Sequence, residues 1–228
     1  TGVAAINAGG VTIHSFFQLP FGPIIPESQQ VNGSTRQQVE SQSHKPTFKL
    51  NKTKLKIMRS LDLLVIDEIS MVRADLLDAV DAALRKARRS STAFGGVQLL
   101  MIGDIQQLAP VARPNEWELL QPYYKSVYFF DSHVLQNNPY ICVELDHIYR
   151  QNDKEFINIL NQVRNNRLDK ASMDLLNRRY LPDFNPKDKE GYITLTTHNS
   201  QADEINEQKL DALKSKPLTF EAEITGIF

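Results

Sequence analysis

The chain has 228 residues, of which 41% are hydrophobic and 23% charged, as is typical of a globular protein with a substantial core. Its formal net charge of −1 at pH 7 excludes a uniformly basic nucleic-acid-binding protein. Any affinity for a phosphate backbone must therefore come from a local patch. No apolar run is long enough to span a bilayer and no signal-peptide pattern opens the chain, so we expect no membrane partner.

Cysteine usage bounds the redox chemistry. The single cysteine, Cys142, excludes an internal disulfide and a cysteine-rich zinc site. It lies in the apolar run YICVEL, which predicts a core position. We expect an intracellular, reducing compartment, with the bacterial cytoplasm and the eukaryotic nucleus or mitochondrion all open.

The amino-acid composition of the first fifty residues changes after residue 17. Residues 1–8 predict a short helix ending at Gly9-Gly10. Thr12 predicts the N-cap of a second helix, TIHSFF. Residues 18–53 then contain four prolines and many polar residues with little apolar periodicity, which predicts an inserted module such as a small hairpin.

Two buried strands and a helix follow the insertion. The apolar run Leu63–Ile66 predicts a strand covered on both faces, and Val97–Ile102 predicts a second buried strand. Between them, apolar residues at helical spacing predict a helix with acids early and cations late, as its dipole prefers. The densest basic cluster ends this helix, either as a solvated helix end or as a phosphate-binding patch: Arg85, Lys86, Arg88 and Arg89.

Later segments continue the alternation of strands and helices. SVYFF, YICVEL and YITLTT predict short strands, and three helices are predicted: one capped by Asp153, one over Met173–Tyr180 and one from Ser200 to about Leu213. Such alternation predicts an α/β fold with a parallel sheet, whose ligands bind beyond the carboxyl ends of the strands. The predicted strand ends carry Asp67-Glu68, Gly103-Asp104 and Thr197-His198.

These strand ends offer the groups that hydrolysis of a nucleotide needs. Asp67 suits a Mg²⁺ ligand and Glu68 a base for the attacking water, although the pair could also simply solvate a strand end. Gln106 and Gln107 follow the second strand, where an amide could contact the γ-phosphate; the alternative is an ordinary turn. Arg150 could neutralise charge on the transferred phosphate or be a surface arginine.

Four stretches together resemble successive motifs of superfamily 1B DNA helicases of the petite-integration-frequency (PIF) type, with RecD-like enzymes more distant: TGVAAINAGGVTIHSFF, LDLLVIDEISMVRADLLD, GGVQLLMIGDIQQLAPV and LDHIYRQ…FINILNQVR. The resemblance covers nearly the whole chain apart from residues 18–53. It implies a RecA-like P-loop NTPase sheet flanked by helices: residues 1–17 and 54–180 in the first RecA-like domain, 18–53 as a wedge-like insert, and 181–228 leading into the second domain.

The resemblance also implies roles for individual residues, with ATP and Mg²⁺ as cofactors. Asp67 and Glu68 become the Mg²⁺-binding and water-activating acids, Gln107 the γ-phosphate contact and Arg150 an arginine finger. Single-stranded DNA, and forked duplex DNA, would be the partners. The residues expected along the single strand are Thr1, Gly2, His14, Ser15 and a stacking Phe16 or Phe17, where core packing of the two phenylalanines is the alternative.

One family motif does not occur in these 228 residues. There is no G-x-x-x-x-G-K-[ST], the loop whose backbone N–H groups, lysine and hydroxyl hold the phosphates and Mg²⁺. By the resemblance this loop lies upstream of Thr1, so we expect a helicase fragment that hydrolyses nothing measurable by itself.

The intact parent is then expected to couple ATP hydrolysis to 5′-to-3′ movement on single-stranded DNA, in repair, replication or telomere maintenance. Three alternatives stay open. The parent could be the helicase part of a nuclease complex or relaxase. The chain could also be a degenerate DNA- or protein-binding module, or a P-loop ATPase unrelated to DNA.

Overall fold

The computed structural model describes residues 5, 9–26, 51–184, 192–213, 215 and 218. The chain divides into two compact units, Thr1–Arg150 and Gln151–Phe228, which are treated separately below. Thr1 and Gly2, the predicted helix around them and the central part of the predicted insert, residues 27–50, lie outside the described residues. The helix over 1–8 and the hairpin in the insert therefore stay predictions.

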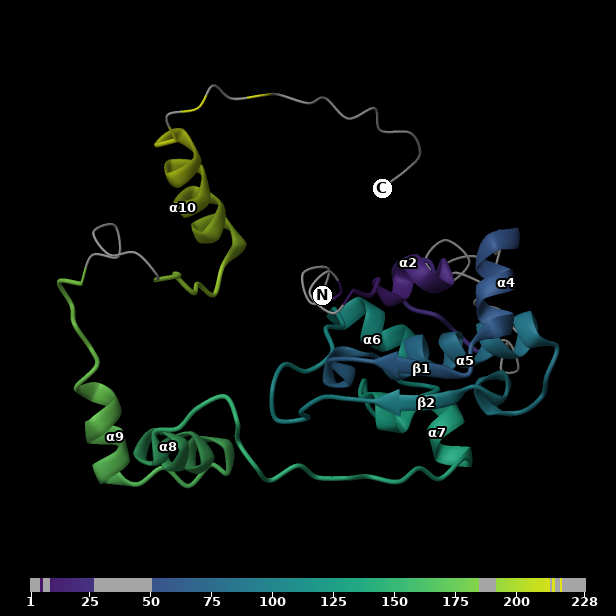
Figure 1. Ribbon diagram of the computed structural model, residues 1–228, viewed down its shortest axis with the longest axis horizontal. Coiled ribbons are helices and arrows are strands. Elements are labelled where there is room, and N and C mark those ends of the chain that lie inside the picture. The colour runs from purple at the N-terminus through teal and green to yellow at the C-terminus, as the bar shows by residue number, and fades with distance from the viewer. Residues whose placement is uncertain are drawn as a thin grey trace. The chain divides into compact units, whose positions relative to one another are not determined.

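The first unit is built around a parallel pair of strands joined by a helix (Figure 1). β1 pairs with β2 in a register that runs from Leu63 opposite Gln98 to Ile66 opposite Met101, which confirms the predicted parallel α/β class. The elements in chain order are α2 (Ile13–Phe17), α4 (Lys52–Ser60), β1 (Leu63–Ile66), η2 (Ile69–Met71), α5 (Ala74–Arg88), η3 (Ala93–Gly96), β2 (Gln98–Met101), α6 (Pro114–Leu120), η4 (Phe129–Asp131) and α7 (His133–Asn137).

Helix α5 provides the centre of the core. Its side chains Leu77, Val80 and Leu84 are completely buried, because apolar residues recur on one face at helical spacing. Each such burial contributes roughly 1.5–3 kcal/mol relative to an exposed side chain. Phe17 from α2 and Met58 from α4 complete the cluster.

The two strands are covered on one face only within the described chain. Leu64 and Ile66 turn toward the core cluster, whereas Leu63 and Val65 are 46% and 49% exposed. The prediction that β1 is covered on both faces is therefore wrong for the described residues. A continuous apolar run is compatible with burial on both faces, but it does not supply the second covering layer.

The predicted insert leaves and rejoins the core at one place. The Gln18 side-chain oxygen accepts a hydrogen bond from the Asn51 backbone N–H at 3.0 Å, so its two ends lie side by side. Asn51 in turn caps α4, a helix that the sequence analysis did not predict, by accepting from the Lys54 N–H at 2.8 Å. Leu19 and Ile24 are buried in the core, so the first part of the segment packs with the sheet domain.

Three predicted strands do not form. Residues 126–130 make a single bridge, Arg73 with Tyr128, before η4, and residues 140–145 and 192–197 contain no strand. A strand requires a continuous hydrogen-bonded neighbour, and among the described residues the first run has only this isolated bridge while the other two have no paired segment. Cys142 is consequently exposed, which corrects the prediction that it lies in the core.

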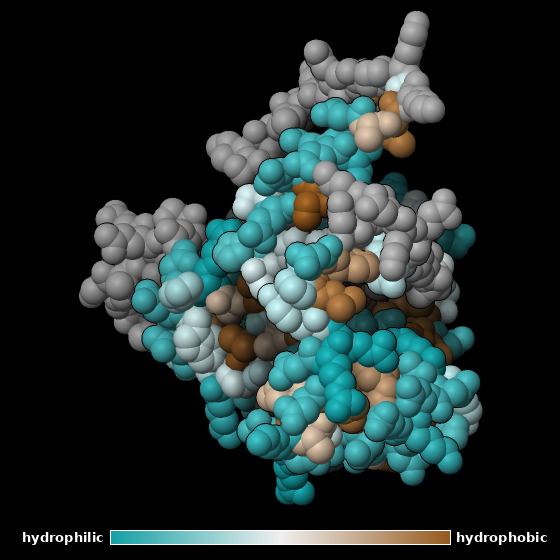
Figure 2. Space-filling model, turned by 90° about the vertical axis from the view of Figure 1, so that its left-hand side faces the viewer, coloured by the Kyte–Doolittle hydropathy of each residue, from teal (hydrophilic) through white to brown (hydrophobic). Residues whose placement is uncertain are grey.

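The second unit contains three helices among its described residues: α8 (Lys154–Arg164), α9 (Lys170–Asn177) and α10 (Asn199–Asp211). Asp153 caps α8 as predicted, accepting from the N–H groups of Glu155 and Phe156. Apolar side chains stay partly exposed on the described surface, and Figure 2 shows such brown areas among hydrophilic teal ones. No described helix has both the length and the apolar character needed to cross a membrane.

Candidate nucleotide and nucleic-acid site

Backbone hydrogen bonds join the loops that follow β1 and β2. The Ile102 N–H donates to the Ile66 carbonyl, and the Ile69 N–H donates to the Ile102 carbonyl, both at 2.9 Å. These bonds continue the parallel pairing past the last strand residues. The predicted polar strand ends, Asp67-Glu68 and Gly103-Asp104, therefore meet at the carboxyl edge of the sheet, as the sequence analysis expected.

The acid pair occupies a strained turn. Glu68 has φ 54° and ψ 45°, the left-handed region, and its N–H donates to Asp67 Oδ1 at 2.9 Å. A non-glycine residue there costs on the order of 1–3 kcal/mol and is found disproportionately at functional sites. Asp67 is exposed and Glu68 half-buried, so both carboxylates remain available to a ligand. No sequence pattern signals this backbone conformation.

Asp104 positions the candidate phosphate sensor. Its Oδ2 accepts from Gln107 Nε2 at 3.1 Å and its Oδ1 from the Gln106 N–H at 3.1 Å. From the sequence, Asp104 is predicted only to be a polar residue at a strand end. An aspartate that starts a turn two residues before an N–H it can bind is the signal that would have found it.

The acids suit a nucleotide-bound Mg²⁺ better than a metal held by protein alone. Among the described residues, no group of three or more histidine, cysteine, aspartate or glutamate side chains is arranged so that it could hold a metal ion. Mg²⁺ at nucleotide sites commonly takes one or two carboxylates and completes its octahedron with water and phosphate oxygens. Asp67 and Glu68 fit that requirement.

Arg150 is the one candidate of the nucleotide group that stands apart. It is exposed at the end of an irregular segment, residues 138–150. Among the described residues its side chain makes no hydrogen bond or ion pair, so the structure does not bring it together with Asp67, Glu68 and Gln107. Its role as an arginine finger stays a prediction.

The candidate DNA residues on α2 fall into two groups. Phe17 is buried in the core, whereas Phe16 is half-buried. The Phe16 ring packs edge-on against Phe17, with 4.8 Å between the ring centroids. The Lys54 ammonium lies over the Phe16 ring, 5.0 Å from its centroid. Core packing therefore describes Phe17, whereas Phe16 both packs and reaches the surface. Ser15 is exposed, and its N–H donates to Thr12 Oγ1 at 3.4 Å, which confirms the predicted cap.

His14 forms an aromatic pair that the sequence analysis missed. Its ring stacks on Phe21, with centroids 5.1 Å apart and planes 17° from parallel, and Phe21 is 78% exposed. Burial lowers the pKa of His14, and the nearby Arg73 cation lowers it further, so the imidazole is mostly neutral at pH 7. Phe21 lies between Pro20 and Pro23 without apolar periodicity, and no pattern marks it as a surface aromatic.

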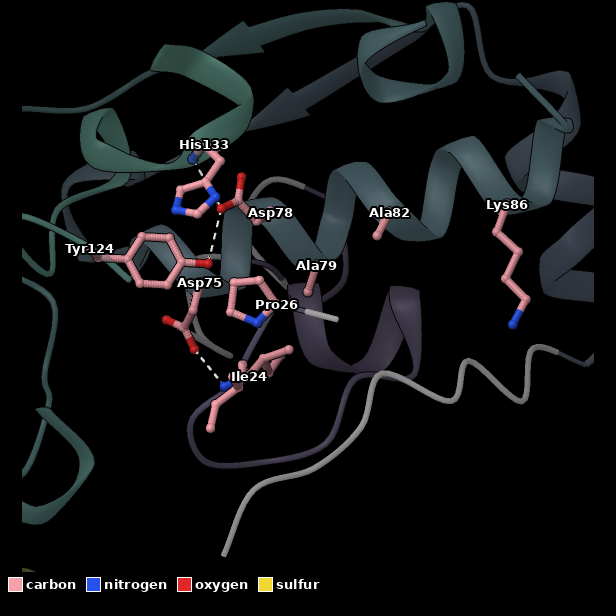
Figure 3. Close-up of a pocket in the computed structure, with 10 residues that line it drawn as sticks. Ile24, Pro26, Asp75, Asp78, Ala79, Ala82, Lys86, Tyr124 and His133 are labelled. Carbon is pink, nitrogen blue, oxygen red and sulfur yellow. Dashed lines mark hydrogen bonds between the residues drawn. The ribbon is translucent and has the colours of Figure 1, made fainter. Parts of the chain in front are cut away.

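A cavity of about 500 Å³ lies beside α5 (Figure 3). Its polar side chains form hydrogen bonds that stabilise the fold. Asp78 accepts from the Tyr124 hydroxyl at 3.0 Å and from the N–H groups of His133 and Val134 at 3.0 and 2.9 Å, which caps α7. Burial raises the pKa of the Asp78 carboxyl above its usual value, and these hydrogen bonds, which favour the charged form, offset only part of that rise.

Asp78→Ala is expected to lower the free energy of unfolding by about 2–4 kcal/mol, because a hydroxyl and two helix N-terminal N–H groups lose their acceptor. Urea denaturation would measure the loss. The matched variant Tyr124→Phe removes only one of the three bonds and should cost about 1 kcal/mol. Equal stability of Asp78→Ala and the unmodified chain would contradict the capping role.

The parallel sheet with acids and an amide at its carboxyl edge defines a RecA-like α/β domain, and comparison with solved structures agrees. A Pif1 helicase from Bacteroides, in complex with ADP-AlF3 and ssDNA, matches with 39% identity over 95% of this chain and 47% of that chain, at a TM-score of 0.78. A structure of two coordinating Pif1 helicases at forked dsDNA matches with 40% identity over 92% of this chain and 46% of that chain, at a TM-score of 0.77.

The family follows from the sequence comparison. The model of the PIF1-like helicase family matches residues 1–174, and this chain belongs to that family. The ATP-dependent DNA helicases PIF1 of Danio rerio and Homo sapiens are 32% and 33% identical to it over 97% of its length. The chain spans about a third of those two relatives, 31% of each.

Proposed function

We propose that this chain forms part of the motor of an ATP-dependent DNA helicase that moves 5′ to 3′ on single-stranded DNA. The observation that carries the proposal is the carboxyl edge of the sheet, where Asp67 and Glu68 lie beside the loop in which Asp104 holds Gln107. Membership of the PIF1-like helicase family supports the nucleic-acid substrate, and the two Pif1 structures were solved with ssDNA or at forked dsDNA.

Each residue at this edge has a distinct role in the proposal. Asp67 binds the Mg²⁺ of the bound ATP, which would shield charge on the β- and γ-phosphates. Glu68 takes the proton of the attacking water, and Gln107 contacts the γ-phosphate. Arg150 approaches once nucleotide is bound and stabilises charge on the transferred phosphoryl group.

The α2 surface supplies the contacts to single-stranded DNA. Ser15 and the neutral His14 bind the backbone, while Phe16 stacks on a base. Such stacking is worth about 1–3 kcal/mol per base and tolerates any sequence, which suits a motor that moves along DNA. By family resemblance, Thr1 and Gly2 also contact single-stranded DNA.

The proposal is tested by unwinding. Forked DNA with a 5′ single-stranded tail should be separated by the full-length protein with ATP and Mg²⁺, and the same fork with only a 3′ tail should not. Unwinding of the 3′-tailed fork alone would overturn the polarity. DNA binding without any ATP hydrolysis would instead support the degenerate binding module.

We expect the 228 residues alone to bind ATP weakly and to hydrolyse none, because they contain no G-x-x-x-x-G-K-[ST] loop. A phosphate-release assay with and without single-stranded DNA measures this. Fusion behind the P-loop segment of the Bacteroides relative serves as the control and should restore hydrolysis. DNA-stimulated hydrolysis by the 228 residues that Glu68→Gln abolishes would contradict the prediction.

A further inference from the structure

A basic cavity lies at the edge of the sheet opposite the candidate nucleotide site. Helix α4 ends just before β1, and α5 ends shortly before β2, so both helix C-termini lie at the amino edge of the strands. Arg59 from α4, with Arg88 and Arg89 from the end of α5, lines a cavity of about 350 Å³ there. Three cations converge on one space that is large enough for a phosphate group.

Two stretches of the chain near this cavity are rich in positive side chains, although the exposed Asp62 lies between the first stretch and β1. Residues 51–61 contain four cations and no acid, and residues 82–103 contain another four and no acid, although the whole chain has a net charge of −1. On α4 the exposed residues Lys52, Lys56 and Arg59 follow the i, i+4, i+7 spacing and therefore share one face. These three side chains form a local basic stripe on α4 that leads to the cavity.

Hydrogen bonds between the helix ends explain part of this arrangement. Arg88 donates from Nη1 to the carbonyls of Arg59 and Leu61 at 2.8 and 2.9 Å. Arg59 donates from Nε to the Ala87 carbonyl at 2.8 Å. These bonds satisfy the open carbonyl groups of the two helix ends. They give no role to Arg89, Lys56 or Lys52, and the ion pairs among described residues do not include any cavity arginine.

The side chain of Arg89 has no structural role among the described residues. Arg89 is the C-cap of α5 with φ 52° and ψ 46°, a left-handed position that usually holds glycine. Its side chain is exposed and makes no hydrogen bond or ion pair with the other described residues. A long cation therefore occupies a position where glycine would fold more easily.

We propose that the cavity and the stripe bind the phosphodiester backbone of DNA, at a site separate from the single-stranded track on α2. The inference rests on the proposed function for the identity of the polyanion. Arginine offers a planar set of donors that can hold one phosphate through two hydrogen bonds, and the lysines add charge along the strand. The site would hold a second stretch of DNA, either a duplex arm or a free single strand.

The test is the salt dependence of DNA binding by the 228-residue chain without nucleotide. Fluorescence anisotropy with a labelled duplex, and separately with its single strand, would be recorded between about 50 and 200 mM salt. The variant Lys56→Gln/Arg89→Gly removes two cations that make no described side-chain contact. The control Arg178→Gln/Arg179→Gln removes two exposed cations from the second unit.

We expect the Lys56→Gln/Arg89→Gly variant to bind more than about tenfold more weakly at 0.1 M salt, with the slope of log K against log salt smaller by about two on duplex DNA. The control should change neither value. Glycine suits the left-handed position, so the thermal midpoint of Arg89→Gly should not fall, which separates loss of binding from loss of structure. The DNA form whose binding is weakened more by these substitutions, duplex or single strand, is the one that occupies the site.

Unchanged affinity and slope in the Lys56→Gln/Arg89→Gly variant would overturn the inference, as would an equal loss in the control. No DNA binding by the unmodified chain would overturn it as well. The measurement requires neither ATP hydrolysis nor unwinding, so failure of this inference can be told apart from failure of the helicase proposal.

Discussion

Glu68→Gln in the full-length protein is expected to lower the rate of DNA-stimulated ATP hydrolysis by about 10²–10⁴-fold, the usual contribution of a general base. The amide keeps the size of the side chain but has no affinity for the proton of the attacking water. The Glu68 side chain makes no described hydrogen bond, so the fold and the binding of nucleotide should persist. Phosphate release measures the rate, and equilibrium binding of a fluorescent ATP analogue measures the affinity.

The exposed Glu118 offers a matched control, because Glu118→Gln removes an equal charge from α6. Hydrolysis by that variant should stay within about twofold of the unmodified protein, as expected for a surface substitution. Two results would exclude Glu68 as the base: hydrolysis retained in Glu68→Gln, or an equal loss in both variants. Lost ATP affinity would instead assign Glu68 to binding.

Local features of the fold could be predicted from the sequence because their causes are local. Thr12 and Asp153 precede helical segments and carry side-chain oxygens that bind N–H groups of the first turn, and both cap helices in the structure. The strand over Leu63–Ile66 and the helix after it were likewise predicted from apolar runs and spacing. The position of Asp67 and Glu68 at the carboxyl edge of the sheet was predicted from their place directly after that strand.

Features that depend on distant partners could not be predicted. Residues 140–145 are apolar enough for a strand. A strand forms only beside a neighbouring strand, however, and residue spacing within one segment does not show which segment that would be. Cys142 is exposed as a result. The hydrogen bond between Gln18 and Asn51 joins residues 33 positions apart. The left-handed backbone of Glu68 is also fixed by tertiary packing, since the loop after β2 holds the residue that follows it.

That loop makes Gly103 the residue on which the geometry of the acid pair depends most directly. A Cβ atom at Gly103 would lie 2.9 Å from the Ile69 backbone nitrogen and 3.0 Å from its Cγ2 atom, both closer than ordinary contacts allow. The chain cannot move a backbone nitrogen aside without breaking the bond from the Ile69 N–H to the Ile102 carbonyl. A side chain at this position would therefore displace Glu68 from the loop next to it.

Gly103→Ala is expected to destabilise the protein by about 1–3 kcal/mol through overpacking. It should also lower ATP hydrolysis by about 10²-fold, because a shift of about 1 Å in a catalytic group has an effect of that size. Hydrolysis would be measured in the full-length protein at a temperature where denaturation curves show it to be folded.

Gly95→Ala separates the effect on the site from the effect on stability. A Cβ atom there would lie 2.8 Å from the Leu84 carbonyl oxygen, and Gly95 has φ +62°, so this variant should lose at least as much stability. Gly95 lies in η3, at the amino side of β2 and away from the acid pair, so the folded Gly95→Ala protein should hydrolyse ATP normally. If both variants lose hydrolysis in proportion to their stability, Gly103 has no specific role in placing Glu68. If only Gly103→Ala loses it, the close approach of the two loops is what aims the carboxylate at the water.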